Sequence, residues 1–336
     1  MRKLLVSPAP HIHSAENTRR IMMDVLIALA PSLLVSIYFF GFSAIQLVVV
    51  GALTCVGVEY VIQKYLLKTE VTISDLSAAV TGVLLALNLP PNSPWWLMLI
   101  GSIVAIGVAK MTFGGLGQNI FNPALVGRVF LLISFPVLMT DWTIPESWFR
   151  AGVDVDATTG ATPLALVKEG LAQGLSVEEI LANSLDLSYF QMLFVKTGGS
   201  VGEVSAFALL LGFAYLLFRR VIRPHIPVTI FLTIALFSGI FWLIDPNQYM
   251  DPLFNILTGG VLIGSIFMAT DYVTSPMTAR GMVIYGVGIG VITMLIRMFG
   301  SYPEGISFAI LIMNSVVPLI NKYIKPARFA KEVKNG

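Results

Sequence analysis

Cysteine and histidine are scarce in this sequence. Its 336 residues include one cysteine, Cys55, and three histidines, at positions 11, 13 and 225. A single cysteine can neither close a disulfide within the chain nor supply the four thiolates of an iron–sulfur cluster. The histidines flank apolar runs instead of lying inside them, which argues against a haem held between helices. If this chain carries electrons, an organic cofactor has to carry them.

Charge is scarce as well. Only 12% of the residues are charged and 56% are hydrophobic, which excludes an ordinary soluble globular protein. The formal net charge of +2 gives no reason to expect a nucleic-acid partner. Apolar runs of about 17 residues or more recur along the chain, each long enough to cross a hydrocarbon core as a helix. We therefore expect the lipid bilayer to surround most of this protein.

The apolar runs predict an all-α polytopic membrane protein with ten transmembrane helices. The first run is followed by many others and has no small-residue cleavage site, so it is interpreted as an integral span and not as a signal peptide. The expected spans lie near 22–41, 43–63, 74–90, 94–112, 119–138, 203–219, 226–244, 252–270, 281–299 and 304–321.

The positive residues give these spans a direction. If the N-terminus is cytoplasmic, only Arg150, Lys168, Lys196 and Arg297 fall on the outer side, and Arg128 lies within a span. All other lysines and arginines then fall on the inner side, as the positive-inside rule requires. Both termini are therefore expected in the cytoplasm, and the long polar loop outside.

The five spans on each side of the polar loop resemble each other in sequence. Thr-Gly-Val-Leu-Leu at 81–85 is matched by Thr-Gly-Gly-Val-Leu at 258–262, and the fifth and tenth spans carry Asn and Pro at 122–123 and 314–318. Because five is an odd number, the second half must be inverted relative to the first. We expect two inverted five-helix repeats with discontinuous third and fifth helices, which place irregular backbone near the membrane midplane. Chance similarity among spans rich in Gly and Thr is the alternative. The predicted units are 1–139, the extracytoplasmic loop 140–202, and 203–336 with its cytoplasmic tail.

The polar loop contains Asp-Ala-Thr-Thr-Gly-Ala-Thr-Pro at 156–163. Thr162 followed by Pro163 predicts a helix start, with a hydroxyl N-cap and proline at the first helical position. The free N–H groups and the dipole of such a start attract phosphate and other anions. An ordinary cap in a surface loop is the other interpretation. In both cases we expect the Thr162 side chain to be exposed. Further along, the stretch from Ser176 to Glu179 is typical of a capping box that opens a second helix, to about Asn183.

Polar residues also gather at 110–123, where glycines precede Asn119 and Asn122. Backbone N–H groups and amides there would suit the edge of a flavin ring, a quinone or an anion. A bent helix entry whose amides bond to free carbonyls is the structural alternative. Glu59 and Asp271 lie within or beside spans, where acids are costly and usually functional. Asp75, which follows Ser74, is better explained as a helix-start residue.

Three stretches, at 114–124, 132–140 and 156–164, occur in the order and spacing found in one known family. The chain resembles the D subunits of the Rnf ion-translocating electron-transport complex, which are related to the B subunits of the sodium-pumping NADH:quinone reductase. The short segment before the first span is more similar to the Rnf members. The resemblance covers the whole chain and implies a ten-helix inverted-repeat fold. It also implies a complex that passes electrons between reduced ferredoxin and NAD while moving Na⁺ or H⁺ across the membrane.

The same resemblance implies the cofactors. In this family the last threonine of Asp-x-x-[Ser/Thr]-Gly-Ala-Thr carries FMN as a phosphoester, attached by a flavin transferase. That residue is Thr162 here, preceded by Thr159, Gly160 and Ala161; many members have serine where this chain has Thr159. Riboflavin is implied as a second, non-covalent flavin in the membrane. The implied partners are the A-, B-, C-, E- and G-type subunits, which include iron–sulfur carriers and an FMN-bearing extracytoplasmic subunit.

A flavin on the outer loop cannot alone pass electrons across roughly 30 Å of hydrocarbon. We therefore expect the second flavin near 114–123 and the break at 270–271, with Asn119 and Asn122 bonding the ring edge. Asp271 would set the protonation of the ring or bind the coupled cation. Two other functions remain open: the B-type quinone-reductase subunit, and a colourless channel or transporter for a small polar solute.

Overall fold

The structure is a computed structural model, and it describes residues 17–142, 160–177, 179–180, 189–194, 199–300, 302 and 304–326. Within these ranges the regular structure is helical throughout, without a strand. Three of the helices continue into, or contain, π-helical turns: Ile62–Leu67, Val104–Val108 and Gly264–Met268. The α-helices are α1 (Thr18–Phe40), α2 (Phe42–Val61), α3 (Ser77–Leu87), α4 (Trp95–Ile103), α5 (Pro123–Ser134), α6 (Pro136–Met139), α7 (Pro163–Ala172), α9 (Tyr189–Phe194), α10 (Ala206–Phe218), α11 (His225–Ile244), α12 (Pro252–Leu257), α13 (Val261–Ile263), α14 (Ala279–Phe299) and α15 (Ile306–Tyr323).

Six helical segments among the described residues are long and apolar enough to cross a membrane. They are Thr18–Phe40, Phe42–Leu67, Trp95–Phe113, His225–Ile244, Ala279–Phe299 and Ile306–Tyr323. The other expected spans coincide with the shorter helices α3, α5 and α10 and with the interrupted segment α12–α13. The prediction of an all-helical, multi-pass membrane protein is confirmed. Ten crossings remain a prediction.

Local sequence explains where several helices begin. The Asp75 carboxylate accepts from the Ser77 backbone N–H at 2.8 Å and from its hydroxyl at 2.7 Å, so the interpretation of Asp75 as a helix-start residue is confirmed. At α5 the Asn122 side chain caps the backbone N–H groups of Ala124 and Leu125, and Pro123 takes the first position. A short polar side chain followed by proline satisfies N–H groups that a helix start leaves unpaired.

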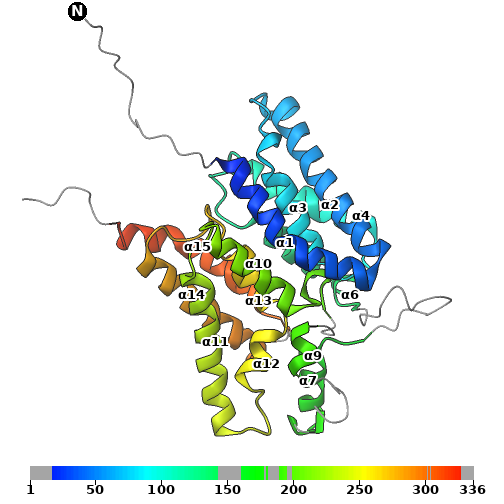
Figure 1. The fold of residues 1–336 in the computed structure, drawn as a ribbon, viewed down its shortest axis with the longest axis vertical. Helices are drawn as coiled ribbons and strands as arrows, with labels where there is room; N and C mark the ends of the chain where they lie inside the picture. The colour runs from blue at the N-terminus through cyan, green and yellow to red at the C-terminus, as the bar shows by residue number, and fades with distance from the viewer. Residues whose placement is uncertain are drawn as a thin grey trace, which may run out of the picture.

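The two halves repeat the same packing. In the first half α2 packs on α3 and α4, α4 packs on α5, and α5 on α3. In the second half α11 packs on α12 and α14, α14 packs on α15, and α15 on the π-helical turn Gly264–Met268. The first helices of the halves, α1 and α10, pack against each other. Figure 1 shows α7 and α9 at the end of the helices away from both ends of the described chain.

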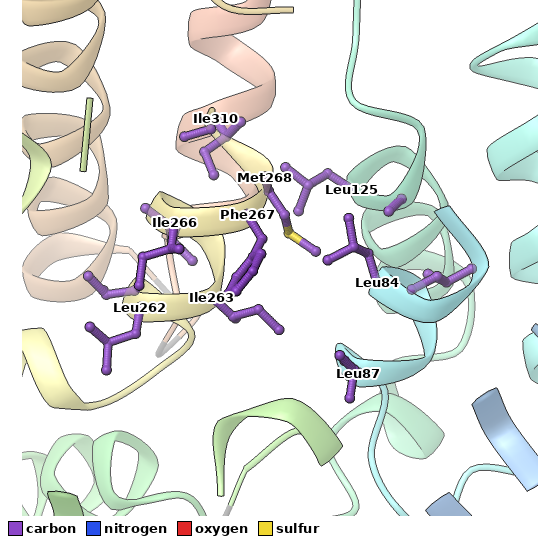
Figure 2. Packing of buried hydrophobic residues seen from close by; sticks show 14 of the residues in the cluster. Leu84, Leu87, Leu125, Leu262, Ile263, Ile266, Phe267, Met268 and Ile310 are labelled. Carbon is purple, nitrogen blue, oxygen red and sulfur yellow. The ribbon is translucent and has the colours of Figure 1, made fainter. Parts of the chain in front are cut away.

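The halves meet in one apolar core. Leu84, Leu87 and Leu125 of the first half face Ile263 and Met268 of the second (Figure 2). Small residues permit the closest helix contacts within the halves. A Cβ on Gly82 of α3 would lie 2.5 Å from the carbonyl oxygen of Gly51 in α2, so only glycine allows these two backbones to approach so closely.

Helix interruption occurs in the eighth expected span but not in the tenth. The chain turns at Gly259 and Gly260, with φ of 65° and 71°, between α12 and α13. In contrast, α15 runs without a break through Asn314 and Pro318, and α3 is short but continuous. The expectation of a break within the tenth span was therefore wrong, whereas α-helix in the third span covers only Ser77–Leu87 of the expected 74–90. Proline removes one N–H donor but leaves the helix intact when the surrounding packing holds it.

Candidate functional site

Thr162 begins α7, as the sequence predicts. Its Oγ1 accepts from the backbone N–H of Ala165 at 3.2 Å, and the preceding Gly160 donates its N–H to the carbonyl of Trp142 at 2.9 Å. Ala161 is exposed, and Thr159 lies outside the described residues. The expectation of an exposed Thr162 was wrong, because its side chain is only 3% exposed.

Packing of α7 explains this burial. Leu164 and Val167 belong to an apolar cluster that also includes Ile180 of the loop and Phe254 of α12. The loop is thus held against the helices and contributes to their surface. The predicted capping box is also confirmed: the Glu179 carboxylate accepts from the backbone N–H of Ser176 at 2.9 Å, and the Ser176 hydroxyl accepts from the Glu179 N–H at 3.3 Å. The first of these bonds lowers the pKa of Glu179. The expected end of that helix near Asn183 lies outside the described residues.

A pocket with a cavity volume of about 340 Å³, partly open to solvent, runs along α7. Lys168 of α7 closes one edge by donating to the backbone carbonyls of Gly300 and Tyr302, and partial burial lowers the pKa of its ammonium. The lining residues are Leu164, Val167, Lys168, Leu171 and Ala172 from α7, Gln248, Tyr249, Met250 and Asn255, and Met294, Arg297 and Met298 from α14.

Arg297 fixes the helix interruption beneath α7. Its guanidinium donates to the carbonyls of Asn255 at 2.6 Å and Thr258 at 2.7 Å, which are carbonyls that the end of α12 leaves without helical partners. A Cβ on Gly259 would lie 2.3 Å from a Leu164 methyl carbon. The start of α7 therefore rests directly on the interrupted helix.

A second pocket, with a cavity volume of about 80 Å³, lies between the two halves. Asn119, Asn122 and Asp271, which the sequence singled out together, all lie on its wall. Leu84, Ile266 and Phe267, labelled in Figure 2, supply part of its apolar lining. Ligand pockets typically enclose about 300–1,000 Å³ with mostly apolar walls and a few polar groups, so the walls are typical of a ligand site, but the cavity would have to widen to take a flavin ring.

The polar groups of this second pocket differ in how fully they are bonded. Asn122 caps α5 and also donates to the carbonyl of Met268 at 3.1 Å, so its amide is fully used in joining the halves. Asp271 accepts from the Thr274 hydroxyl at 3.1 Å. Asn119 donates to the carbonyl of Phe121, but its Oδ1 is buried without a hydrogen-bond partner among the described residues. Such an atom needs a donor from a ligand or water.

The asparagines predicted as counterparts in the fifth and tenth spans meet beside this pocket. Asn314 is fully buried, and its amide lies 2.6 Å from the Tyr285 hydroxyl. When that amide is oriented so that its nitrogen faces backbone carbonyls, its oxygen accepts from the backbone N–H of Asn122 at 3.1 Å. The bent entry of α5 is thus held from both halves.

Two buried ion pairs were not predicted. Lys110 lies 2.6 Å from Glu59, and Arg128 of α5 pairs with Glu304 while donating to the Asn88 side chain at 2.8 Å. Both partners of each pair are distant in sequence. Their only sequence signal is a charge inside or beside an apolar run, which indicates a buried partner without naming it.

Together, the fold and the two pockets define a multi-pass helical membrane protein with a small, mostly apolar cavity between its halves. The model of the NQR2, RnfD, RnfE family matches residues 5–330, and the chain belongs to this family. The resemblance found in the sequence is therefore confirmed.

Individual relatives agree over nearly their whole length. The D subunit of the Na⁺-translocating ferredoxin:NAD⁺ oxidoreductase complex of Acetobacterium woodii is 46% identical over 323 residues, covering 96% of this chain and 94% of the relative. The D subunit of the proton-translocating ferredoxin:NAD⁺ oxidoreductase complex of Clostridium ljungdahlii is 40% identical over 324 residues, covering 96% and 95%. The D subunit of the ion-translocating oxidoreductase complex of Pectobacterium carotovorum is 37% identical over 355 residues, covering 96% and 98%.

Proposed function

We propose that this chain is the D subunit of an ion-translocating ferredoxin:NAD⁺ oxidoreductase complex in a bacterial membrane. Family membership and near-complete coverage of relatives named for that complex carry the proposal. The relatives are named for Na⁺ in one case and for protons in another, so the proposal includes both ions. The other subunits of the complex, including its iron–sulfur carriers, are the expected partners.

Deleting this chain is expected to abolish ferredoxin-dependent NAD⁺ reduction in membrane vesicles, together with the ion uptake coupled to it. Both activities should return when the chain is supplied on a plasmid. Vesicles without the chain that retain full coupled activity would contradict the proposal. A colourless purified chain that conducts a small solute would instead favour the channel or transporter.

The fold we propose for this function has ten crossings in two inverted five-helix repeats, with both termini in the cytoplasm and the loop 140–202 outside. The equivalent packing of the two halves and the contact between Asn122 and Asn314 support the repeat. The positive-inside distribution of Lys and Arg supports the direction.

Cysteine labelling tests this direction. Gln173→Cys, on the exposed end of α7, should react with an impermeant thiol reagent in intact cells. Thr69→Cys, in the exposed segment after α2, should react only after lysis. Native Cys55 is fully buried, so it should give little background. If position 69 but not position 173 is labelled in intact cells, the orientation of the chain in the membrane is the opposite of the one proposed.

Covalent FMN on Thr162 is the cofactor assignment that we propose for α7. Esterification replaces the hydroxyl hydrogen and leaves Oγ1 lone pairs for the Ala165 N–H. The phosphate would lie at a helix N-terminus, where unpaired N–H groups and the helix dipole favour an anion. The pocket along α7 begins at Leu164, near enough for the ring of a tethered flavin, and its methionines and Tyr249 suit an aromatic occupant.

We place a second, non-covalent flavin, riboflavin by family resemblance, in the pocket between the halves. The mostly apolar lining and the unpartnered Oδ1 of Asn119 support this assignment, because a flavin ring is largely apolar and carries an N–H donor on its edge. A bound flavin would supply reversible electron transfer at this depth. The chain's own residues exclude water, hold the ring and place charges around it. Asn122 serves mainly to join the halves, and Asp271 faces the pocket as its acidic group.

A further inference from the structure

Lys110 is a buried cation beside the pocket between the halves. It is 1% exposed, and its Nζ donates to Glu59 at 2.6 Å and to the Ser77 hydroxyl at 2.7 Å. Lys110 and Ser77 line the pocket, whereas Glu59 lies behind them and does not. The ammonium group therefore joins Ser77 of the pocket wall to a carboxylate outside that wall.

The charges on the pocket wall come from opposite halves. Among the residues that line the pocket, only Lys110 and Asp271 carry a full charge, and they belong to the first and second half respectively. A buried lysine costs considerable free energy unless its charge is compensated. One carboxylate compensates Lys110 at rest, which makes the pair neutral and leaves its positive end nearer to the pocket.

We propose that Lys110 sets the reduction potential of the electron carrier in this pocket, with Glu59 limiting how strongly it does so. The proposal rests on the second flavin described above. One electron comes from the iron–sulfur carriers of the complex, which are oxidised as the flavin is reduced. Lys110 keeps its three protons, and no bond forms or breaks. The added negative charge is attracted to the ammonium, so reduction becomes more favourable.

The direction follows from Coulomb's law. A cation favours negative charge added near it, and a buried cation is screened less than an exposed one. Removing the Glu59 charge should make the electrostatic potential in the pocket more positive, because the ammonium of Lys110 is then no longer compensated. Removing Lys110 should take that positive potential away. A pair that only fixes packing would change stability and flavin content but not the potential.

The experiment uses the complete complex carrying Thr162→Asn, so that the covalent flavin does not obscure the signal. Glu59→Gln is compared with the double variant Glu59→Gln, Lys110→Met. The two differ only in the cation, and neither leaves an unpaired buried carboxylate. Flavin content is measured first by extraction, and then the potential of the bound flavin is measured by spectroelectrochemical titration.

Glu59→Gln should raise the potential above that of the Glu59 protein. The reduction potential of the flavin in the double variant should be lower than in Glu59→Gln by at least about 59 mV. For a one-electron step this corresponds to a tenfold change in the equilibrium constant. Glu59→Gln with Lys110→Arg should keep the higher value, because it keeps the charge. If the reduction potential is the same with and without Lys110 at full flavin content, the proposed role of Lys110 is wrong, and the second flavin site is unaffected. Absence of extractable riboflavin, separated by chromatography from any FMN of the partner subunits, from the Thr162→Asn complex itself would overturn the second flavin site and this inference together.

Discussion

Thr162→Asn is expected to abolish covalent flavin while leaving α7 capped. Asparagine caps helices as well as threonine does, but it has no hydroxyl to esterify. Thr162→Ser should retain the flavin, and Thr162→Ala should lose it at a further cost of about 1 kcal/mol in stability through the lost cap. In-gel fluorescence after acid denaturation and the intact mass of the chain measure the attachment.

Comparing Thr162→Asn with Thr162→Ala separates loss of the esterified hydroxyl from loss of the helix cap. Equal amounts of membrane-inserted Thr162→Asn and wild-type chain, with flavin on the wild type alone, would support the assignment. A flavin mass that persists in Thr162→Asn, or that maps to the nearby Thr158 or Thr159, would refute it.

The second large effect concerns the pocket between the halves. Purified with its partners, Thr162→Asn protein should retain one extractable flavin per chain, and adding Asn119→Leu should remove most of it. Leucine has no acceptor for the N–H edge of a flavin, so the buried donor would be unpaired at a cost of about 1–3 kcal/mol, or roughly five- to 150-fold in affinity. Extraction followed by chromatography and absorbance measures the stoichiometry.

Asn92→Leu provides the control, because Asn92 is exposed and does not line the pocket. It should leave the extractable flavin unchanged. Asn122→Leu is a poorer test, since it removes the cap of α5 and the bond to Met268 and so disturbs the junction itself. Retention of flavin in Asn119→Leu would remove Asn119 from the site.

Much of this architecture could be predicted because its signals are local. Apolar runs marked every helical segment that was expected to span the membrane, and a polar residue before proline marked the starts of α5 and α7. The polar clusters at 110–123 and 270–271 were expected to lie near one site, and Asn119, Asn122 and Asp271 do line one pocket.

The unpredicted features depend on contacts that sequence spacing does not reveal. Lys110 and Glu59 are 51 residues apart, and Arg128 and Glu304 are 176 apart, so packing alone selects each partner. The tenth span was expected to break at Pro318, but α15 continues through it. The burial of Thr162 was missed for a similar reason, because a polar loop gave no sign that its first helix packs on α12.

That burial has a consequence for the order of biogenesis. With Thr162 only 3% exposed, a transferase has no route to Oγ1 once α7 has settled on the interrupted helix. If Thr162 bears FMN, loading has to come before docking, or the loop has to lift away. The flavin would then be sealed in by the same folding step that closes the loop. Chains that fold before they meet the transferase would be modified only while the loop is lifted, so the yield of active complex would depend on the timing of two competing reactions.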